Sequence, residues 1–286
     1  MNFLNPLELN KNRVFLNRHA KSYSLHAILQ AEIAARLLER LSFIFLKPTR
    51  ILHLGAKTGD LSQKLTILYP ESEIYSLDLA EKMLQEGVIK QKIRDPICAN
   101  YLQLPFKPDS FDLVIAELVL PWVADYSQFF SACQRVLTEG GLLLFTTFGP
   151  DTLKELRCSF AKINSYSYVH EFIDMHHFGD FLLASYWLDP VVDMEIININ
   201  YRSITQLLMD LKNTGSGNIH INRNRGLMTK NILYQMEKNY QQFANTNHSL
   251  PATYEIIYGH ALKQATSIEV LETTEHLFPV KKLFKK

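Results

Sequence analysis

The sequence has few cysteines and no long apolar run. Its 286 residues include three cysteines, Cys98, Cys133 and Cys158, which are widely spaced and odd in number. This argues against a disulfide scaffold and favours a reducing compartment, so we expect a cytoplasmic protein. No segment reaches the ~18 uninterrupted apolar residues of a membrane helix, and the amino terminus lacks the apolar run of a signal peptide. We therefore expect no membrane association.

Other chemical signatures are missing too. The formal net charge is only +1, and no strong basic stripe is visible, so we expect no nucleic acid partner. No C-x-x-C spacing, metal-ligand cluster or Ser-His-Asp set occurs, and we expect no metal. The sequence says nothing about oligomeric state. The apolar fraction of 47% and the charged fraction of 21% are ordinary for a globular protein.

Short apolar runs alternate with helical patterns in the first half of the chain. Strands alternating with helices predict a parallel, doubly wound α/β sheet. Gly140 and Gly141 are expected to end a helix before the fifth strand. The expected strands are 50–56, 73–79, 96–100, 111–118 and 141–148, and the helices between them are 58–69, 80–91 and 126–137.

The pattern changes beyond residue 150. A helix over 172–188, a strand over 190–201, a helix over 203–211 and a last strand over 252–262 are expected. A helical insertion between the last two strands would lie over the carboxyl edge of the sheet, where ligands bind in open α/β folds. The predicted division is an amino-terminal helical segment covering the site (1–45), an α/β core (46–202), a helical insertion or lid (203–250), the last core strand (251–265) and a tail (266–286).

The stretch "ILHLGAKTGD" (51–60) reads as a strand, a tight glycine turn and a helix. Gly55 and Gly59 allow the turn and close backbone approach, and the helix N-terminus favours an anionic group. Asp78 ends the second strand, where an acid can bind two ribose hydroxyls. Asn100 ends the third strand, where its amide could pair with an adenine. Three strand ends thus point to a nucleotide-like cofactor, although Asp78 could instead cap the next helix.

Five stretches carry a resemblance to the class I S-adenosylmethionine (SAM) dependent methyltransferases. They are more closely similar to the biotin-pathway family that methylates malonyl-acyl carrier protein. The resemblance implies a Rossmann-like, mostly parallel seven-stranded sheet, SAM as cofactor, S-adenosylhomocysteine as product, and an acyl carrier protein carrying malonyl as partner. The stretches are 17–41, 104–157, 172–183, 208–218 and 250–261.

The resemblance also implies site residues. The implied cofactor-binding residues are Gly55, Lys57, Gly59, Asp78, Leu79, Asn100, Tyr101, Glu117 and Tyr23. Methylation of a carboxylate needs positioning but no general base, because the acceptor is already anionic at neutral pH. A cation for that carboxylate is expected, since the planar arginine fork matches a carboxylate. The candidates are Arg157, Arg202 and Arg223, and no catalytic residue is assigned.

Some positions depart from the family pattern. His53 replaces an aspartate, Ala56 a cysteine, Lys57 the middle glycine of the turn, and Asn100 an aspartate. Lys57 could pair with the methionine carboxylate of SAM, or it could occupy the site.

Three functional hypotheses follow from the resemblance and these departures. The first is methylation of the malonyl carboxylate on a carrier protein, at the start of biotin synthesis. The second is another SAM-dependent reaction, including hydroxylation as in a similar mitochondrial complex I assembly factor. The third is a non-catalytic descendant that binds a partner. Arg223, Arg225 and Lys230 in the stretch 222–231 are candidates for docking an acidic carrier protein, unless they are simply a solvated loop.

Overall fold

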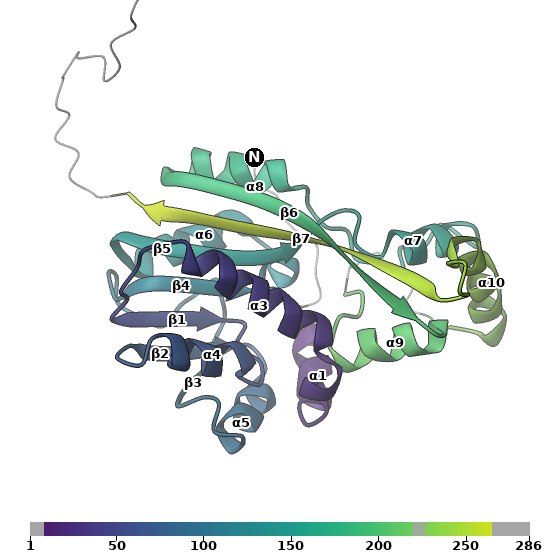
Figure 1. Cartoon of the computed structure of the whole chain (residues 1–286), viewed down its shortest axis with the longest axis horizontal. Helices are drawn as coiled ribbons and strands as arrows, with labels where there is room; N and C mark the ends of the chain where they lie inside the picture. Colours follow the sequence, from purple (N-terminus) through teal and green to yellow (C-terminus); the bar gives the residue numbers. More distant parts are fainter. Residues whose placement is uncertain (1–8, 220–222, 224–225, 227, 265–286) are drawn as a thin grey trace, which may run out of the picture.

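The computed structural model describes residues 9–219, 223, 226 and 228–264, and within them seven strands form one sheet (Figure 1). The strand order is β3-β2-β1-β4-β5-β7-β6. The pairs within β1 to β5 are parallel, and β7 is antiparallel to both β5 and β6. The predicted fold class is confirmed. The strands are β1 (Arg50–Leu54), β2 (Glu73–Asp78), β3 (Asp95–Cys98), β4 (Phe111–Glu117), β5 (Leu137–Phe148), β6 (Trp187–Tyr201) and β7 (Leu250–Lys263).

Helices cover both faces of the sheet. One buried cluster joins α3 and α4 to one face, and another joins α6 and α8 to the opposite face. The α-helices are α1 (Leu9–His19), α2 (Tyr23–His26), α3 (Ile28–Ser42), α4 (Asp60–Leu68), α5 (Glu81–Ile89), α6 (Tyr126–Val136), α7 (Lys154–Ala161), α8 (Met175–Ala184), α9 (Ile204–Asn213) and α10 (Lys230–Tyr240). Two short 3-10 helices are η1 (Leu120–Trp122) and η2 (Gln241–Phe243).

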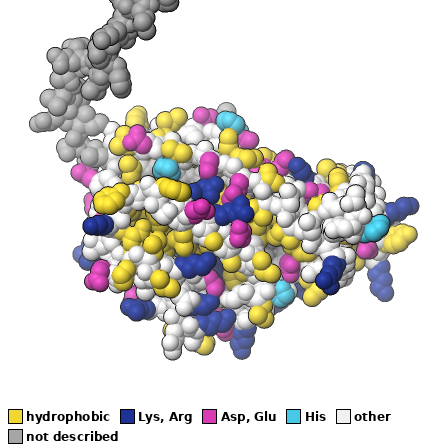
Figure 2. Space-filling view, in the orientation of Figure 1, with side chains coloured by type: hydrophobic (Ala, Val, Ile, Leu, Met, Phe, Trp, Pro, Cys, Tyr) yellow, Lys and Arg dark blue, Asp and Glu magenta, His cyan; other side chains and the backbone are white. Residues whose placement is uncertain are grey.

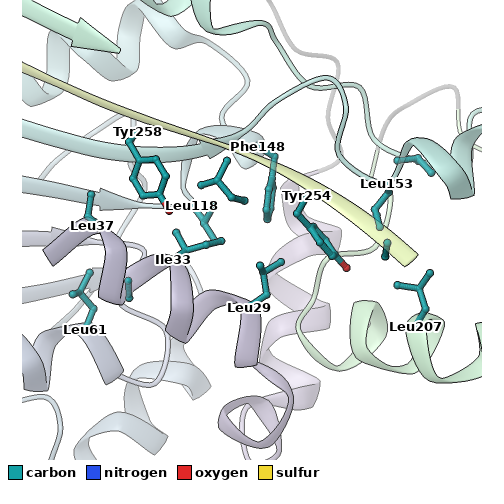
Figure 3. Close-up of a cluster of buried hydrophobic side chains, with 14 of the residues drawn as sticks. Leu29, Ile33, Leu37, Leu61, Leu118, Phe148, Leu153, Leu207, Tyr254 and Tyr258 are labelled. Atoms are coloured by element: carbon teal, nitrogen blue, oxygen red, sulfur yellow. The ribbon is translucent and has the colours of Figure 1, made fainter. Parts of the chain in front are cut away.

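Burial on both faces explains the unbroken apolar run Leu113–Ala116 within β4. Leu113 and Ile115 join the cluster under α3, whereas Val114 and Ala116 join the cluster under α6. Successive side chains of a strand point to opposite faces, so a strand covered on both sides has no polar face. Figure 3 shows side chains of α3, including Leu37, directed toward the sheet.

The start of β5 differs from the sequence prediction. Helix α6 ends at Val136 and β5 begins at the next residue, so Gly140 and Gly141 lie inside the strand and do not end a helix. Gly140 has φ +70° beside a shift in register between β4 and β5. The prediction was wrong here because a glycine pair serves a strand irregularity as well as a helix end.

The last two strands extend past the rest of the sheet, and helices lie between them in the sequence. β5 pairs with β7 only as far as Phe148 opposite Ile256, whereas β6 and β7 pair on to Tyr201 opposite Leu250. Helices α9 and α10 follow at this far end (Figure 1).

The loop after β5 and the first turn of α7 are fastened to the extended part of β7. The backbone N–H of Gly149 donates to the carbonyl of Glu255 at 2.9 Å. The buried Glu155 carboxylate accepts from the N–H of Thr253 at 3.1 Å and also from its hydroxyl. Two stretches that carry the family resemblance, one on each side of the insertion, therefore meet as one structural unit.

Charges are interspersed on the face shown in Figure 2. Arg36 and Arg40 of α3 pair with Glu195 and Asp193 of β6 at 2.6 Å and 3.1 Å. In the described part of the chain, no helix is long and apolar enough to span a membrane. The same residues include no group of three or more His, Cys, Asp or Glu that could hold a metal ion.

Candidate cofactor and substrate site

The glycine turn after β1 is packed so closely that two of its positions exclude a side chain. Gly55 has φ +78°, and a Cβ there would lie 2.6 Å from the carbonyl oxygen of Glu117. Gly59 has φ +82°, and a Cβ there would lie 2.5 Å from Ile93. A left-handed backbone and a close neighbour both require glycine.

Asp78 fixes this turn from the end of β2. Its carboxyl group is 1% exposed and accepts from the backbone N–H of Lys57 at 3.0 Å and of Ala80 at 2.8 Å. Burial raises the pKa of Asp78, and the neighbouring positive charge of Lys57 only partly offsets this effect. The bond to Ala80 does not make Asp78 a helix cap, because Ala80 is itself the N-cap of α5 and has no side-chain cap bond. Each carboxylate oxygen keeps further acceptor capacity, so ribose binding by Asp78 stays a prediction.

Lys57 stands where the family pattern has glycine, and it adopts a left-handed backbone conformation. Its φ is +46°, which costs a non-glycine residue roughly 1 kcal/mol or more. The ammonium turns back over the turn and donates to the carbonyl oxygens of Gly55 and Glu117, each at 3.2 Å. Charged hydrogen bonds of this kind are stronger than neutral ones, so they offset the backbone strain.

Glu117 and His53 form a buried pair beside the turn. The imidazole Nδ1 of His53 lies 2.8 Å from the hydroxyl of Ser62. Its Nε2 lies 3.4 Å from a carboxylate oxygen of Glu117, without hydrogen-bond geometry. Burial favours a higher pKa for Glu117, but Lys57 and His53 outweigh it and lower that pKa below its usual value. Glu117 therefore stays ionised at neutral pH.

Two further buried polar atoms, both in the space that this turn lines, have no hydrogen-bond partner. The Tyr23 hydroxyl belongs to a side chain that is 3% exposed, and Gln30 Oε1 to one that is 8% exposed. Burial, together with the negative charges of Glu117 and Asp78, raises the pKa of Tyr23 well above its usual value. The phenol therefore keeps its proton. A donor and an acceptor are thus available to a ligand, because buried polar groups are nearly always paired.

Gln30 was missed by the sequence analysis. It lies seven positions after Tyr23 in the amino-terminal segment, but the helix is broken at Ala27 between them. The one available signal was a glutamine on a largely apolar helix, which is too common to indicate a ligand site.

The structure brings only part of the predicted cofactor set together. A small cavity of about 20 Å³ is lined by Tyr23, Gly55, Lys57, Asp78 and Tyr101, among others. Glu117 lies beside it and lines a neighbouring cavity with Lys57.

Three predicted residues lie away from the small cavity. Gly59 packs behind the turn, and Leu79 packs against the core. Asn100 is exposed, and its Oδ1 accepts from the N–H of Leu102 at 3.0 Å. The adenine contact predicted for Asn100 stays a prediction.

A second cavity of about 670 Å³ adjoins the first and is much larger. Its wall includes apolar side chains of α3, α7 and α9, of the ends of β5, β6 and β7, and of the segment 168–172. Figure 3 shows Leu29, Phe148 and Tyr254 from this wall. The two cavities share the wall residues Gln30, Trp122, Phe148, Thr214 and Ser216.

Contacts from α2 and α1 tie the amino-terminal segment to the insertion. His26 lies between Asp210 and Asn213, with both nitrogen-to-partner distances at 3.2 Å. The side-chain amide of Asn12 donates to the carbonyl of Gly215 at 3.3 Å. His26 and Asp210 line the large cavity, and Asn12 and Gly215 line the small one, so segments distant in sequence meet at both cavities.

The three predicted arginines lie outside the large cavity. Arg157 donates to the carbonyls of Pro150 at 2.7 Å and Thr152 at 3.1 Å, and so fastens the loop after β5. Arg202 is exposed, and Arg223 lies at an isolated bridge with Ser167. Arg225 falls outside the described residues.

Known proteins with a similar sequence share almost the whole chain. Residues 52–145 match the methyltransferase domain family. The chain is 40% identical to a malonyl-[acyl-carrier protein] O-methyltransferase of Legionella pneumophila, covering 94% of this chain and 96% of that protein. It belongs to this methyltransferase family. The malonyl-[acyl-carrier protein] O-methyltransferase 1 of Coxiella burnetii is 39% identical, over 95% of this chain and 94% of that protein.

Solved methyltransferase structures share the fold at low identity. The YcgJ protein of Bacillus subtilis has a TM-score of 0.58 at 14% identity, covering 80% of this chain and 98% of that one. A SAM-dependent methyltransferase of Thermotoga maritima has a TM-score of 0.52 at 13% identity, covering 88% of this chain and all of that one. The chain is thus a SAM-dependent methyltransferase in both family and fold.

The residues at the turn suit SAM in chemistry. Asp78 is a buried carboxylate, a kind of group that can accept from ribose hydroxyls, and Tyr23 and Gln30 offer a donor and an acceptor. The volume of about 20 Å³ at the turn is far below the ~300 Å³ or more of a typical ligand pocket. Lys57 and the loop 214–216 line this space, so side chains have to move aside when the cofactor enters.

Proposed function

We propose that this methyltransferase converts the free carboxylate of malonyl-acyl carrier protein to its methyl ester, at the start of biotin synthesis. The observation that carries the proposal is the identity of 40% with a family member over 94% of the chain. This identity extends through the insertion, which distinguishes one methyltransferase family from another because the core alone serves many substrates.

The chemistry places few demands on the protein. SAM supplies an electrophilic methyl group on its sulfonium when it is bound. The acceptor carboxylate is anionic at neutral pH, so the protein has to position it and exclude water. The apolar wall of the large cavity and the contact of His26 with Asp210 serve that purpose.

The proposal divides the chain by role. Segments 1–45 and 203–250 act as covers over the core 46–202, and 251–265 completes the core. Contacts from α2 to α9 support this division. The acyl group enters the large cavity, and the cofactor lies along the turn at its inner end.

A cation is required for the acceptor carboxylate, and the cavity adds one candidate. No arginine among the described residues lines the large cavity, whereas Lys212 and His26 do. Arg157, Arg202 and Arg223 stay predictions. Lys212 is the further candidate, because its ammonium belongs to the insertion that closes the cavity.

Docking of the carrier protein is a separate part of the proposal. An acidic partner would be steered by positive charge on the insertion. Lys230 is exposed at the start of α10, and Arg223 precedes it. Their role concerns the rate of encounter more than the chemistry.

The direct test offers malonyl-acyl carrier protein and SAM to the purified protein and follows the methyl ester by mass spectrometry. Acetyl-acyl carrier protein is the matched control, since it lacks the free carboxylate. The expected result is methylation of the malonyl form only. Methylation of neither form by a protein that binds S-adenosylhomocysteine would overturn the substrate assignment.

A second experiment tests whether Lys212 is the cation that binds the acceptor carboxylate. Lys212→Met is expected to raise KM for the malonyl carrier protein about tenfold or more, because a charged hydrogen bond is lost. Lys154→Met, which removes an exposed lysine paired with Asp151, is the control. Equal kinetics for the two variants would remove Lys212 from the site.

A further inference from the structure

Two backbone carbonyls converge on one ammonium group at the ligand edge of the sheet. The ammonium of Lys57 lies 3.2 Å from the carbonyl oxygens of both Gly55 and Glu117. β1 and β4 are neighbouring parallel strands, so these carbonyls lie at the same carboxyl edge, where open α/β folds bind ligands. The edge therefore contains an acceptor pair for a single cation.

Two buried carboxylates near the Lys57 ammonium also favour a positive charge at its position. The side chains of Glu117 and Asp78 are 6% and 1% exposed, and the charge of Lys57 acts on both. An uncompensated buried carboxylate is costly. Removing the lysine ammonium would leave this place in need of another positive group.

The carbonyls of Gly55 and Glu117 have a hydrogen-bond partner, whereas other polar groups of the small cavity do not. Tyr23 and Gln30 present buried atoms without a hydrogen-bond partner in the cavity that Lys57 also lines. Tyr23 and Gln30 are thus still available to bind a ligand. The two carbonyls, in contrast, already bind the ammonium of Lys57.

We propose that the ammonium of Lys57 occupies the place of the amino group of SAM, so that the chain carries a tethered competitor of its own cofactor. SAM and S-adenosylhomocysteine each bear one ammonium on their amino acid part. Two ammonium groups cannot occupy the same position between these carbonyls, because like charges at that distance repel each other. Cofactor entry therefore requires the Lys57 side chain to leave, which lowers the affinity for the amino acid part of the ligand and not for its adenosine part.

This inference rests on SAM as the methyl donor and not on the acyl substrate. It is therefore tested by binding in the absence of any acceptor. The two probes are S-adenosylhomocysteine and 5′-methylthioadenosine, which shares the adenosine and the thioether but lacks the amino acid part. Calorimetric titration gives Kd for each probe with the wild-type protein and with Lys57→Met.

The expected result is specific to one probe. Lys57→Met removes the ammonium but keeps a long side chain in the same backbone conformation. S-adenosylhomocysteine should bind this variant at least about tenfold more tightly than it binds the wild type, since a charged hydrogen-bond site becomes free. The Kd of 5′-methylthioadenosine should stay within about threefold, because it does not use that site.

Two more variants separate the ammonium from strain and bulk charge. Lys57→Gly also relieves the strain of the positive φ. This relief should affect the Kd of both probes equally, so S-adenosylhomocysteine should still gain more affinity than 5′-methylthioadenosine. Lys64→Met removes a positive charge that lines a neighbouring cavity and should leave the ratio of the two Kd values unchanged.

Several outcomes would overturn the proposal. These are weaker binding of S-adenosylhomocysteine by Lys57→Met, an equal change for both probes, no change for either, or no binding of any probe by folded variants. Weaker binding would mean that Lys57 contacts the cofactor carboxylate. Failure to methylate malonyl-acyl carrier protein would leave this test untouched, so the two proposals fail independently.

Discussion

His26 of α2 and Asp210 of α9 lie 3.2 Å apart, nitrogen to oxygen, although 184 residues separate them in sequence. Their contact joins the amino-terminal segment to the insertion over the cavities. Their side chains are 28% and 30% exposed. Such a pair contributes little to overall stability, but it lies where two separate segments meet.

Asp210→Ala should loosen the contact between α2 and α9 more than it destabilises the protein. We expect the free energy of unfolding to fall by no more than about 1 kcal/mol, while amide hydrogen exchange in α9 and α2 becomes faster. Exchange measured by mass spectrometry checks this. Glu73→Gln, which breaks the exposed pair with Arg50, is the control and should leave exchange in α9 unchanged. Unaltered exchange in Asp210→Ala would show that the pair does not hold the segments together.

Two glycines with similar backbone conformation should respond differently to alanine. Gly55 and Gly140 have φ of +78° and +70°, but a Cβ meets close neighbours only at Gly55. We expect Gly140→Ala to cost about 1 kcal/mol from backbone strain and Gly55→Ala to cost roughly 1–3 kcal/mol more from the clash. Urea unfolding of both variants measures the difference. Equal losses would mean that the contact at Glu117 relaxes freely.

The ionisation of Glu117 should make stability depend on acid pH. Its folded-state pKa is lowered by Lys57 and His53 despite burial. The unfolded chain therefore takes up the proton first as the pH falls. The resulting stabilisation is present above the ordinary value of 4.5 and is lost as the pH falls through the folded pKa.

Glu117→Gln tests this dependence. The variant should be less stable than wild type at about pH 7, and the gap should narrow at about pH 4. Denaturant unfolding at both pH values gives the comparison. Glu73→Gln, at an exposed position, should show no such narrowing. A gap that grows in acid would mean that the folded-state pKa of Glu117 lies above its ordinary value.

The three cysteines should differ in reactivity. Cys98 and Cys158 are exposed, whereas Cys133 is fully buried, and burial raises the pKa of its thiol. A thiol reagent should therefore label Cys98 and Cys158 in the native protein and Cys133 only after denaturation. Mass spectrometry of peptides locates the label. Rapid native labelling of Cys133 would mean that the α6 face opens readily.

Arg157→Lys separates a structural role from substrate binding. A lysine cannot reach the carbonyls of both Pro150 and Thr152 in the geometry of the guanidinium. We expect a loss of roughly 1–3 kcal/mol in stability with kcat and KM altered together. Arg50→Gln, which breaks an exposed pair with Glu73, should change neither. A large rise in KM at unchanged stability would instead support the substrate role predicted for Arg157.

Local patterns predicted most of the fold and the outline of the cofactor turn. The alternation of strands and helices is a short-range property, and the parallel sheet follows from it. Gly55, Gly59 and Asp78 were predicted as cofactor-binding because the turn and the strand ends have a readable sequence pattern. Gly140 was misplaced because its role depends on register against β4, a relation between strands.

The partners of individual side chains were not readable in the same way. Nothing in the sequence indicates that the buried Glu155 would bond Thr253, or that Gln30 would leave its oxygen unpaired. These facts depend on which segments meet after folding, and on the few ångströms that decide whether a polar atom finds a partner.

The sequence by itself determined the class of fold, the family and the presence of an altered glycine turn. It left open whether Lys57 would face a ligand carboxylate or fill the site. The tertiary structure decided where its ammonium lies, because β1 and β4 become neighbours only in the folded sheet and bring the carbonyls of Gly55 and Glu117 to the same point. Sequence sets which groups a chain carries, while packing sets which of them satisfy one another.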